Sequence, residues 1–182
     1  MKFNIKENNY HLRCEQKKDV DGIRQVNLDA FKQIQEAKLV EEIRKSDFFV
    51  PELSIVCEKN EQEIVGHILI SKIEIITKES ETLSTLGLAP LSVKPQFQNL
   101  GIGSRLIEYG LELSKRMSFK HMFVLGHPKY YPRFGFAPTE PMGIKSPFPV
   151  PMEVFMGLEL QKGSLKGISG VIKYPPAFDV FS

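Results

Sequence analysis

The fold of this chain is decided by the segment Leu88-Ala89-Pro90-Leu91-Ser92-Val93-Lys94-Pro95-Gln96-Phe97-Gln98-Asn99-Leu100-Gly101-Ile102-Gly103-Ser104. An apolar strand ends here, and a turn with two glycines leads into a helix predicted over about 101–117, because Ile102, Leu106, Tyr109 and Leu113 recur at helical spacing. The first turn of a helix carries unpaired N–H groups at its positive end, and glycines let an anion approach them closely. The segment therefore predicts a diphosphate-binding turn, with a purely structural turn as the alternative.

The glycine spacing excludes two common phosphate-binding motifs. It is neither GxGxxG nor GxxxxGK[ST], so neither a dinucleotide-binding fold nor a nucleotide triphosphatase loop is supported.

Strands and helices alternate on both sides of this segment. Asp19 is expected to cap a helix that carries apolar residues from Val20 to Phe31, and Pro138 to Pro151, with five prolines, reads as a long ordered loop. A second helix is predicted at 35–45, and strands are predicted at 10–15, 53–58, 63–76, 82–93, 120–126, 153–161 and 168–174. The order predicts a mixed α/β (α+β) fold with a largely antiparallel central sheet flanked by helices.

Composition sets the broad class of the protein. The 182 residues are 42% hydrophobic and 25% charged, with a net charge of +2, which is typical of one globular domain over 1–182. We expect a cytoplasmic protein with no membrane-spanning segment, no secretory signal, no nucleic-acid partner and no metal site. Cys14 and Cys57 could form one bridge, and we favour free thiols.

Two motifs together resemble a known family. The stretch Gln98–Gly103 matches the Q/R-x-x-G-x-G/A signature of the GNAT superfamily of acyl-CoA-dependent N-acetyltransferases, and Tyr130–Phe136 is similar to its later F-Y-x-K-x-G-F segment. The order of elements agrees over about 10–161, which leaves a β-rich C-terminal extension at 162–182. The stretches Gly126–Tyr131 and Tyr174–Phe178 more narrowly resemble a bacterial subfamily of uncharacterised predicted N-acetyltransferases.

The resemblance implies where acetyl-CoA binds. In that family the strand before the signature splays from its neighbour and its backbone binds the pantetheine arm, here through Leu91, Ser92 and Val93. The backbone N–H of Val93 would face the thioester oxygen and stabilise the oxyanion. The pyrophosphate would rest on the amides of Gln98, Asn99, Leu100, Gly101, Ile102, Gly103 and Ser104.

The implied reaction is transfer of an acetyl group to a primary amine of a small molecule or peptide by direct attack on the thioester. The family's tyrosine, which protonates the departing thiolate, matches Tyr131, with Tyr130 as the alternative. The general base stays open among Glu74, Glu79, Glu81, His67 and His127, with a chain of water molecules as the alternative to a side chain. Lys94, Arg105, Lys129 and Arg133 are candidates for the coenzyme phosphates.

Two other classes of function remain open from the sequence. The chain could be a non-catalytic acyl-CoA-binding sensor or regulatory module, or an interaction protein whose glycine turn only packs a helix. The acceptor is expected in a cleft capped by the helices at 19–45 and the loop at 138–151. The acceptor's identity, the acyl-chain preference and the oligomeric state, including a homodimer, are left undetermined.

Overall fold

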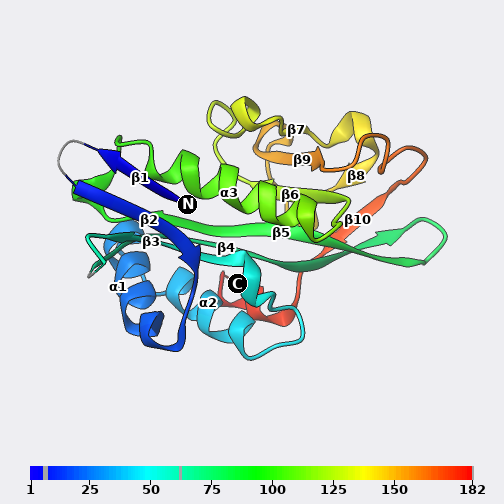
Figure 1. The fold of residues 1–182 in the computed structure, drawn as a ribbon. Coiled ribbons are helices and arrows are strands. Elements are labelled where there is room, and N and C mark those ends of the chain that lie inside the picture. Colours follow the sequence, from blue (N-terminus) through cyan, green and yellow to red (C-terminus); the bar gives the residue numbers. More distant parts are fainter. Residues whose placement is uncertain (6–7, 62, 182) are drawn as a thin grey trace.

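A mixed sheet forms the centre of the computed structural model, which describes residues 1–5, 8–61 and 63–181 (Figure 1). Its strand order is β1-β2-β3-β4-β5-β6-β9-β7, while β10 pairs with β4 and with β8. Among the described strand pairs, β5–β6 and β8–β10 are parallel and the others antiparallel, as the sequence predicts. The strands are β1 (Lys2–Ile5), β2 (Asn8–Cys14), β3 (Ser54–Lys59), β4 (Glu63–Thr77), β5 (Thr82–Val93), β6 (His121–Leu125), β7 (Ala137–Pro138), β8 (Ile144–Lys145), β9 (Phe155–Glu159) and β10 (Gly170–Lys173).

Helices cover both faces of the sheet. Helices α1 (Val20–Phe31) and α2 (Gln35–Arg44) lie on one face, and α3 (Ile102–Arg116) lies on the other (Figure 1). The alternation along β3 explains this layering, since Ile55 and Cys57 pack in the cluster that contains the α3 residues and Val56 packs in the cluster of α1 and α2.

The helix predicted from the central segment is confirmed, but its buried face is rotated from the predicted stripe. Tyr109 and Leu113 are only partly buried, whereas Gly110 is fully enclosed. A Cβ on Gly110 would lie 2.6 Å from the Cδ1 atom of Ile70 on β4, so the glycine allows the helix to approach the sheet closely.

The predicted capping role of Asp19 is wrong. Its carboxylate accepts the N–H of Gln16 at 2.7 Å and pairs with Arg13, with Nη1–Oδ2 at 2.6 Å. Arg13 also pairs with Glu58 on β3, with Nη2–Oε1 at 3.1 Å, and its hydrogen bonds lower the pKa of Glu58. The buried guanidinium therefore ties the start of α1 to the sheet.

Two regions differ from the predicted elements. Strand β1 pairs with β2 although nothing in the sequence pattern predicted it, and the proline-rich loop contains the short strand β8. The connection between the predicted strands at 53–58 and 63–76 includes Gln62, which lies outside the described residues. Cys14 and Cys57 are free, as we favoured. Within the described parts of the chain, no helix combines the length and apolar character needed to cross a membrane.

Candidate functional site

A gap opens beside the C-terminal half of β5. The pairing between β5 and β6 stops at Leu88 opposite Val124, whereas β5 continues beside β4 until Val93 lies opposite Gly66. The splayed strand pair that the sequence predicted is therefore present, and one edge of β5 faces the gap.

The direction of each backbone N–H group determines which residues of β5 can bind a ligand in this gap. The N–H of Lys94 donates to the carbonyl of Val65 on β4 at 2.9 Å. Because backbone groups alternate along a strand, the N–H of Ser92 points to β4, and those of Leu91 and Val93 point to the opposite edge. The Ser92 hydroxyl also donates to the carbonyl of His67 at 3.3 Å, which occupies that side chain within the sheet.

The start of α3 forms a concave surface next to the gap. Gly101 has a φ of +80°, a conformation that favours glycine, and the N–H of Arg105 donates to its carbonyl at 3.1 Å. The N–H groups of residues 102–104 precede that first helical bond and are available to an anion. These residues line a cavity of about 520 Å³, which we call the helix cavity. It is lined by Leu91, Val93, Phe97, Gln98, Asn99, Gly101, Ile102, Gly103, Ser104, Tyr130 and Arg133.

Most of the cofactor residues predicted from the sequence line this cavity, and Leu100 and Ser92 are the two outside its described lining. Among the four predicted basic candidates, Arg133 lines it, with its guanidinium carbon 4.0 Å from the centre of the Tyr130 ring. Lys94 is paired with Glu63, with Nζ–Oε1 at 2.7 Å. Arg105 stacks on Phe3 instead, and Lys129 does not line the cavity.

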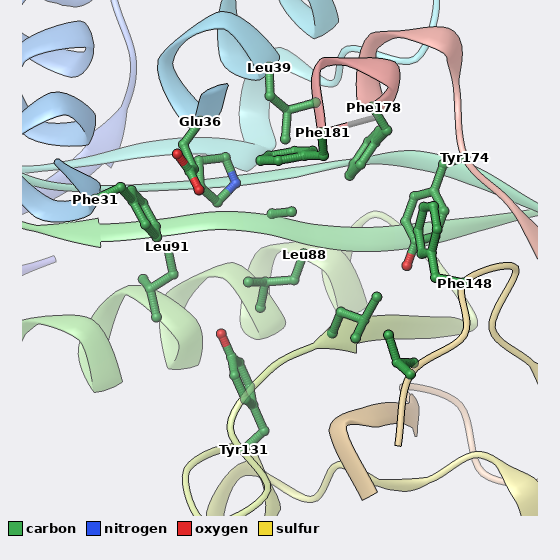
Figure 2. A pocket seen from close by; sticks show the side chains of 14 residues that line it. Phe31, Glu36, Leu39, Leu88, Leu91, Tyr131, Phe148, Tyr174, Phe178 and Phe181 are labelled. Carbon is green, nitrogen blue, oxygen red and sulfur yellow. The ribbon is translucent and has the colours of Figure 1, made fainter. Parts of the chain in front are cut away.

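A second cavity, of about 540 Å³, adjoins the first one at Leu91, which lines both. We call it the aromatic cavity (Figure 2). As the sequence predicted, residues from the 19–45 helices and the 138–151 loop enclose it, and the C-terminal segment adds a wall that was not predicted. Its lining comprises Phe31, Glu36, Leu39, Leu88, Ala89, Pro90, Leu91, Leu125, Tyr131, Phe148, Val150, Tyr174, Phe178 and Phe181.

The two adjacent tyrosines separate into the two cavities. Tyr131 lines the aromatic cavity, and its hydroxyl points toward Leu88 and Leu91 (Figure 2). Burial raises the pKa of Tyr131, so its phenol keeps its proton at neutral pH. The Tyr130 hydroxyl instead lies 2.9 Å from the position of a Cβ on Gly103, in the helix cavity. Of the two tyrosines, Tyr131 is the one among the described residues that line the aromatic cavity, and Tyr130 lies with Leu91 and Val93 in the helix cavity.

The three acidic candidates for the general base lie away from this site. Glu74 is opposite Ser84 and pairs with Lys173, with Oε2–Nζ at 3.1 Å. Glu79 and Glu81 follow at the tip of the β4–β5 hairpin. At a rise of about 3.3 Å per residue, Ser84 is on the order of 20 Å along β5 from Leu91.

The two histidine candidates also do not reach the aromatic cavity lining. His67 is completely buried, with Nε2 3.0 Å from the Ser54 hydroxyl, and burial lowers its pKa to about 4. His127 is exposed and accepts the N–H of Lys129 at Nδ1, at 3.2 Å.

Sequence reasoning missed Glu36, which lines the aromatic cavity from the first turn of α2. Its side chain is buried, Gln33 donates to Oε1 at 2.8 Å, and Oε2 has no hydrogen-bond partner among the described residues. No local motif marks this residue, because its role depends on α2 packing across the end of β5.

The site has three parts: a splayed β-strand, a helix start that can bind an anion, and an adjoining cavity with a buried phenol. These parts are expected of an acyltransferase that holds its donor along a strand edge. The match to known proteins agrees with this class. Residues 20–136 match the acetyltransferase (GNAT) family, and the chain belongs to that family. It is therefore an acyltransferase.

Several relatives share most of the chain. It is 38% identical over 138 residues to the uncharacterised N-acetyltransferase YjhQ of Escherichia coli, covering 75% of each protein. It is 27% identical to the uncharacterised N-acetyltransferase YhbS of the same species over 93% of this chain and 99% of the relative.

Solved structures show the same fold. The crystal structure of E. coli YhbS in complex with CoA matches with a TM-score of 0.87 at 26% identity, covering 95% of this chain and 93% of that one. A GNAT family acetyltransferase from Brucella melitensis in complex with acetyl-CoA matches with a TM-score of 0.76 at 28% identity, covering 93% and 98%.

Proposed function

We propose that the protein transfers an acetyl group from acetyl-CoA to a primary amine of a small molecule or peptide. The observation that carries this proposal is the junction of the two cavities at Leu91, beside the free edge of β5. A donor extending from the helix cavity along this edge would bring its thioester to the aromatic cavity. The two similar crystal structures are complexes with CoA and with acetyl-CoA, which supports this choice of donor.

The helix cavity suits the diphosphate of the coenzyme. The N–H groups of residues 102–104 supply donors at the positive end of α3, and Arg133 supplies a positive charge. No acidic side chain is among the described residues that line this cavity, so nothing there repels an anion. The pantetheine arm would bind the N–H group of Val93, which points to the free edge of β5 within the helix cavity.

The chemistry follows from acyl transfer. An amine near its ordinary pKa is mostly ammonium at neutral pH and must lose a proton before its nitrogen attacks the thioester carbon. The carbonyl oxygen then becomes an oxyanion, which the N–H of Leu91, where the two cavities meet, would stabilise in place of the predicted Val93, since Val93 lines the helix cavity but not the aromatic cavity. The carbon–sulfur bond breaks, the Tyr131 phenol gives its proton to the departing thiolate, and the phenolate takes the extra proton of the cationic attacking nitrogen, which leaves a neutral amide. The proton that the ammonium loses before the attack goes to the solvent.

The buried phenol favours catalysis over the alternative of a binding module, because a sensor of acyl-CoA has no need of an acid in the cavity next to the thioester. The test is to incubate the full chain with acetyl-CoA and a panel of primary amines, and to quantify free coenzyme A and N-acetylated product by mass spectrometry. We expect the two products in equal amounts. Binding of acetyl-CoA without product from any amine would favour the sensor instead.

A further inference from the structure

The aromatic cavity combines an apolar wall with a single carboxylate. Among the described residues that line it, Glu36 is the one with a formal charge, and the others are apolar or aromatic. A cavity of about 540 Å³ is within the range of small-molecule sites, in which a few polar groups fix the orientation of the ligand.

Glu36 lines this cavity and has one carboxylate oxygen without a hydrogen-bond partner among the described residues. That oxygen is Oε2, and the residue is 8% exposed. The first turn of a helix favours a negative charge, which explains an acid at this position of α2. It does not explain a buried oxygen without a hydrogen bond, since such an atom is destabilising until a donor reaches it.

The opposite wall is built from aromatic rings. Phe148 stacks on Tyr174 with ring centres 5.4 Å apart, and Tyr174 contacts Phe178 with ring centres 4.6 Å apart. Other lining residues stay unusually exposed for large apolar side chains: Phe31, Leu125, Phe148 and Phe181 are between 36% and 49% exposed. Large apolar side chains that gather around one cavity and stay exposed to solvent are typical of a ligand site.

The two parts lie at opposite sides of the cavity. Figure 2 shows Glu36 and Leu91 toward one side of the view, with strand β5 passing between them, and Tyr174 with Phe148 toward the other side. Leu91 is where the aromatic cavity meets the helix cavity. A molecule that spans the cavity would thus have its polar end at Glu36, close to the proposed thioester, and its body on the aromatic rings.

We infer that the acceptor is a primary amine carried on a bulky apolar body, preferably an aryl-alkyl one, whose ammonium group is bound by Glu36 and whose body packs on Phe148, Tyr174 and Phe178. This inference rests on the proposed acetyl transfer and narrows its substrate class. Short polar amines fit the site poorly, because they would leave the aromatic wall in contact with water.

The test uses 2-phenylethylamine as the probe, 2-phenylethanol as its uncharged analogue and ethanolamine as a short polar amine. Calorimetry measures binding of each to the full chain saturated with free coenzyme A, and product formation is measured with acetyl-CoA. The aryl-alkylamine should bind at least about tenfold tighter than either control, because only it uses both the carboxylate and the aromatic wall.

Glu36→Gln keeps the shape of the side chain and removes its charge. It should weaken binding of 2-phenylethylamine by about tenfold or more and leave that of 2-phenylethanol unchanged. Glu42→Gln, on the same helix but outside the aromatic cavity lining, is the matched control and should bind all three probes as the unaltered protein does.

Three results would overturn the inference while leaving acetyl transfer standing. These are better binding or turnover of ethanolamine, equal amine affinity in the two glutamine variants, or tighter binding of octanoyl-CoA than of acetyl-CoA with the amine displaced, which would assign the cavity to the acyl chain. Failure of acetyl-CoA itself to bind would instead overturn the proposed function, and the amine titration without coenzyme would then show separately whether the cavity takes this ligand.

Discussion

Replacement of Gly103 by glutamate places a negative charge in the proposed diphosphate site. A Cβ at this position lies 2.9 Å from the Tyr130 hydroxyl and 3.8 Å from side-chain carbons of Leu91 and Val93, so the new side chain must enter the helix cavity. At a separation of about 6 Å and an effective dielectric constant between about 20 and 80, each charge on the bound anion is repelled by about 1–3 kcal/mol. We expect the Kd for acetyl-CoA to rise by about thirtyfold or more.

Gly103→Gln is the control that separates the effect of charge on acetyl-CoA binding from the effect of size, because glutamine fills the same space as glutamate without its charge. Equilibrium dialysis with labelled acetyl-CoA at low and high ionic strength should show the Glu variant binding more weakly than the Gln variant, with the difference shrinking as salt is added. Both variants must displace the Tyr130 hydroxyl to the same extent because both carry a Cβ, so their thermal stabilities should be similar to each other. Equal affinities of the two variants at low salt would refute the assignment of this helix start to the diphosphate.

Three further predictions concern catalysis and stability. Tyr131→Phe should lower turnover by about tenfold or more while the Kd for acetyl-CoA stays within about twofold; full activity would remove Tyr131 as the acid. His67 has a pKa of about 4 when folded against an ordinary value of 6.5, so the unfolded chain binds the extra proton first and stability is lost as the pH falls from 6.5 toward 4. Urea unfolding should show that His67 alone lowers the free energy of unfolding by about 2 kcal/mol between pH 7 and pH 5. An equal loss in His67→Gln would contradict the explanation that burial lowers the pKa of His67. Arg13→Met should lower the free energy of unfolding by about 3–5 kcal/mol, because it leaves two nearly buried carboxylates unpaired. Arg116→Met, at an exposed ion pair, should lower it by less than about 0.5 kcal/mol. Similar losses in the two variants would show that the Arg13 network is as weak as a surface ion pair.

Periodic segments made most of the fold predictable. Apolar spacing in α3 and β-branched runs in β4 and β5 depend on local sequence, and the structure has these elements nearly where the pattern places them. Strand β1 escaped prediction because four residues of mixed polarity become a strand only when β2 offers an edge. Asp19 was misassigned because its partners, Arg13 and Gln16, are positioned by the sheet and by the turn before α1.

The two cavities differ in how much of them the sequence reveals. Most of the helix cavity is formed by the stretch from Leu91 to Ser104, with Tyr130 and Arg133 added from the later motif, so most of its residues could be proposed from a motif and its turn chemistry. The aromatic cavity collects Glu36, Phe148 and Tyr174 from three distant segments, and only tertiary packing brings them together. The stretch Tyr174–Phe178 resembles a bacterial subfamily of predicted N-acetyltransferases, but that resemblance did not indicate that its aromatic rings line a cavity.

The most direct test of the account is a calorimetric titration of the purified full chain with acetyl-CoA, with free coenzyme A and ATP as controls. We expect saturable binding of both coenzyme forms and much weaker binding of ATP, which carries phosphates but no arm to bind the free edge of β5. No binding of either coenzyme form would contradict it, and the glycine turn before α3 would then have a structural role alone.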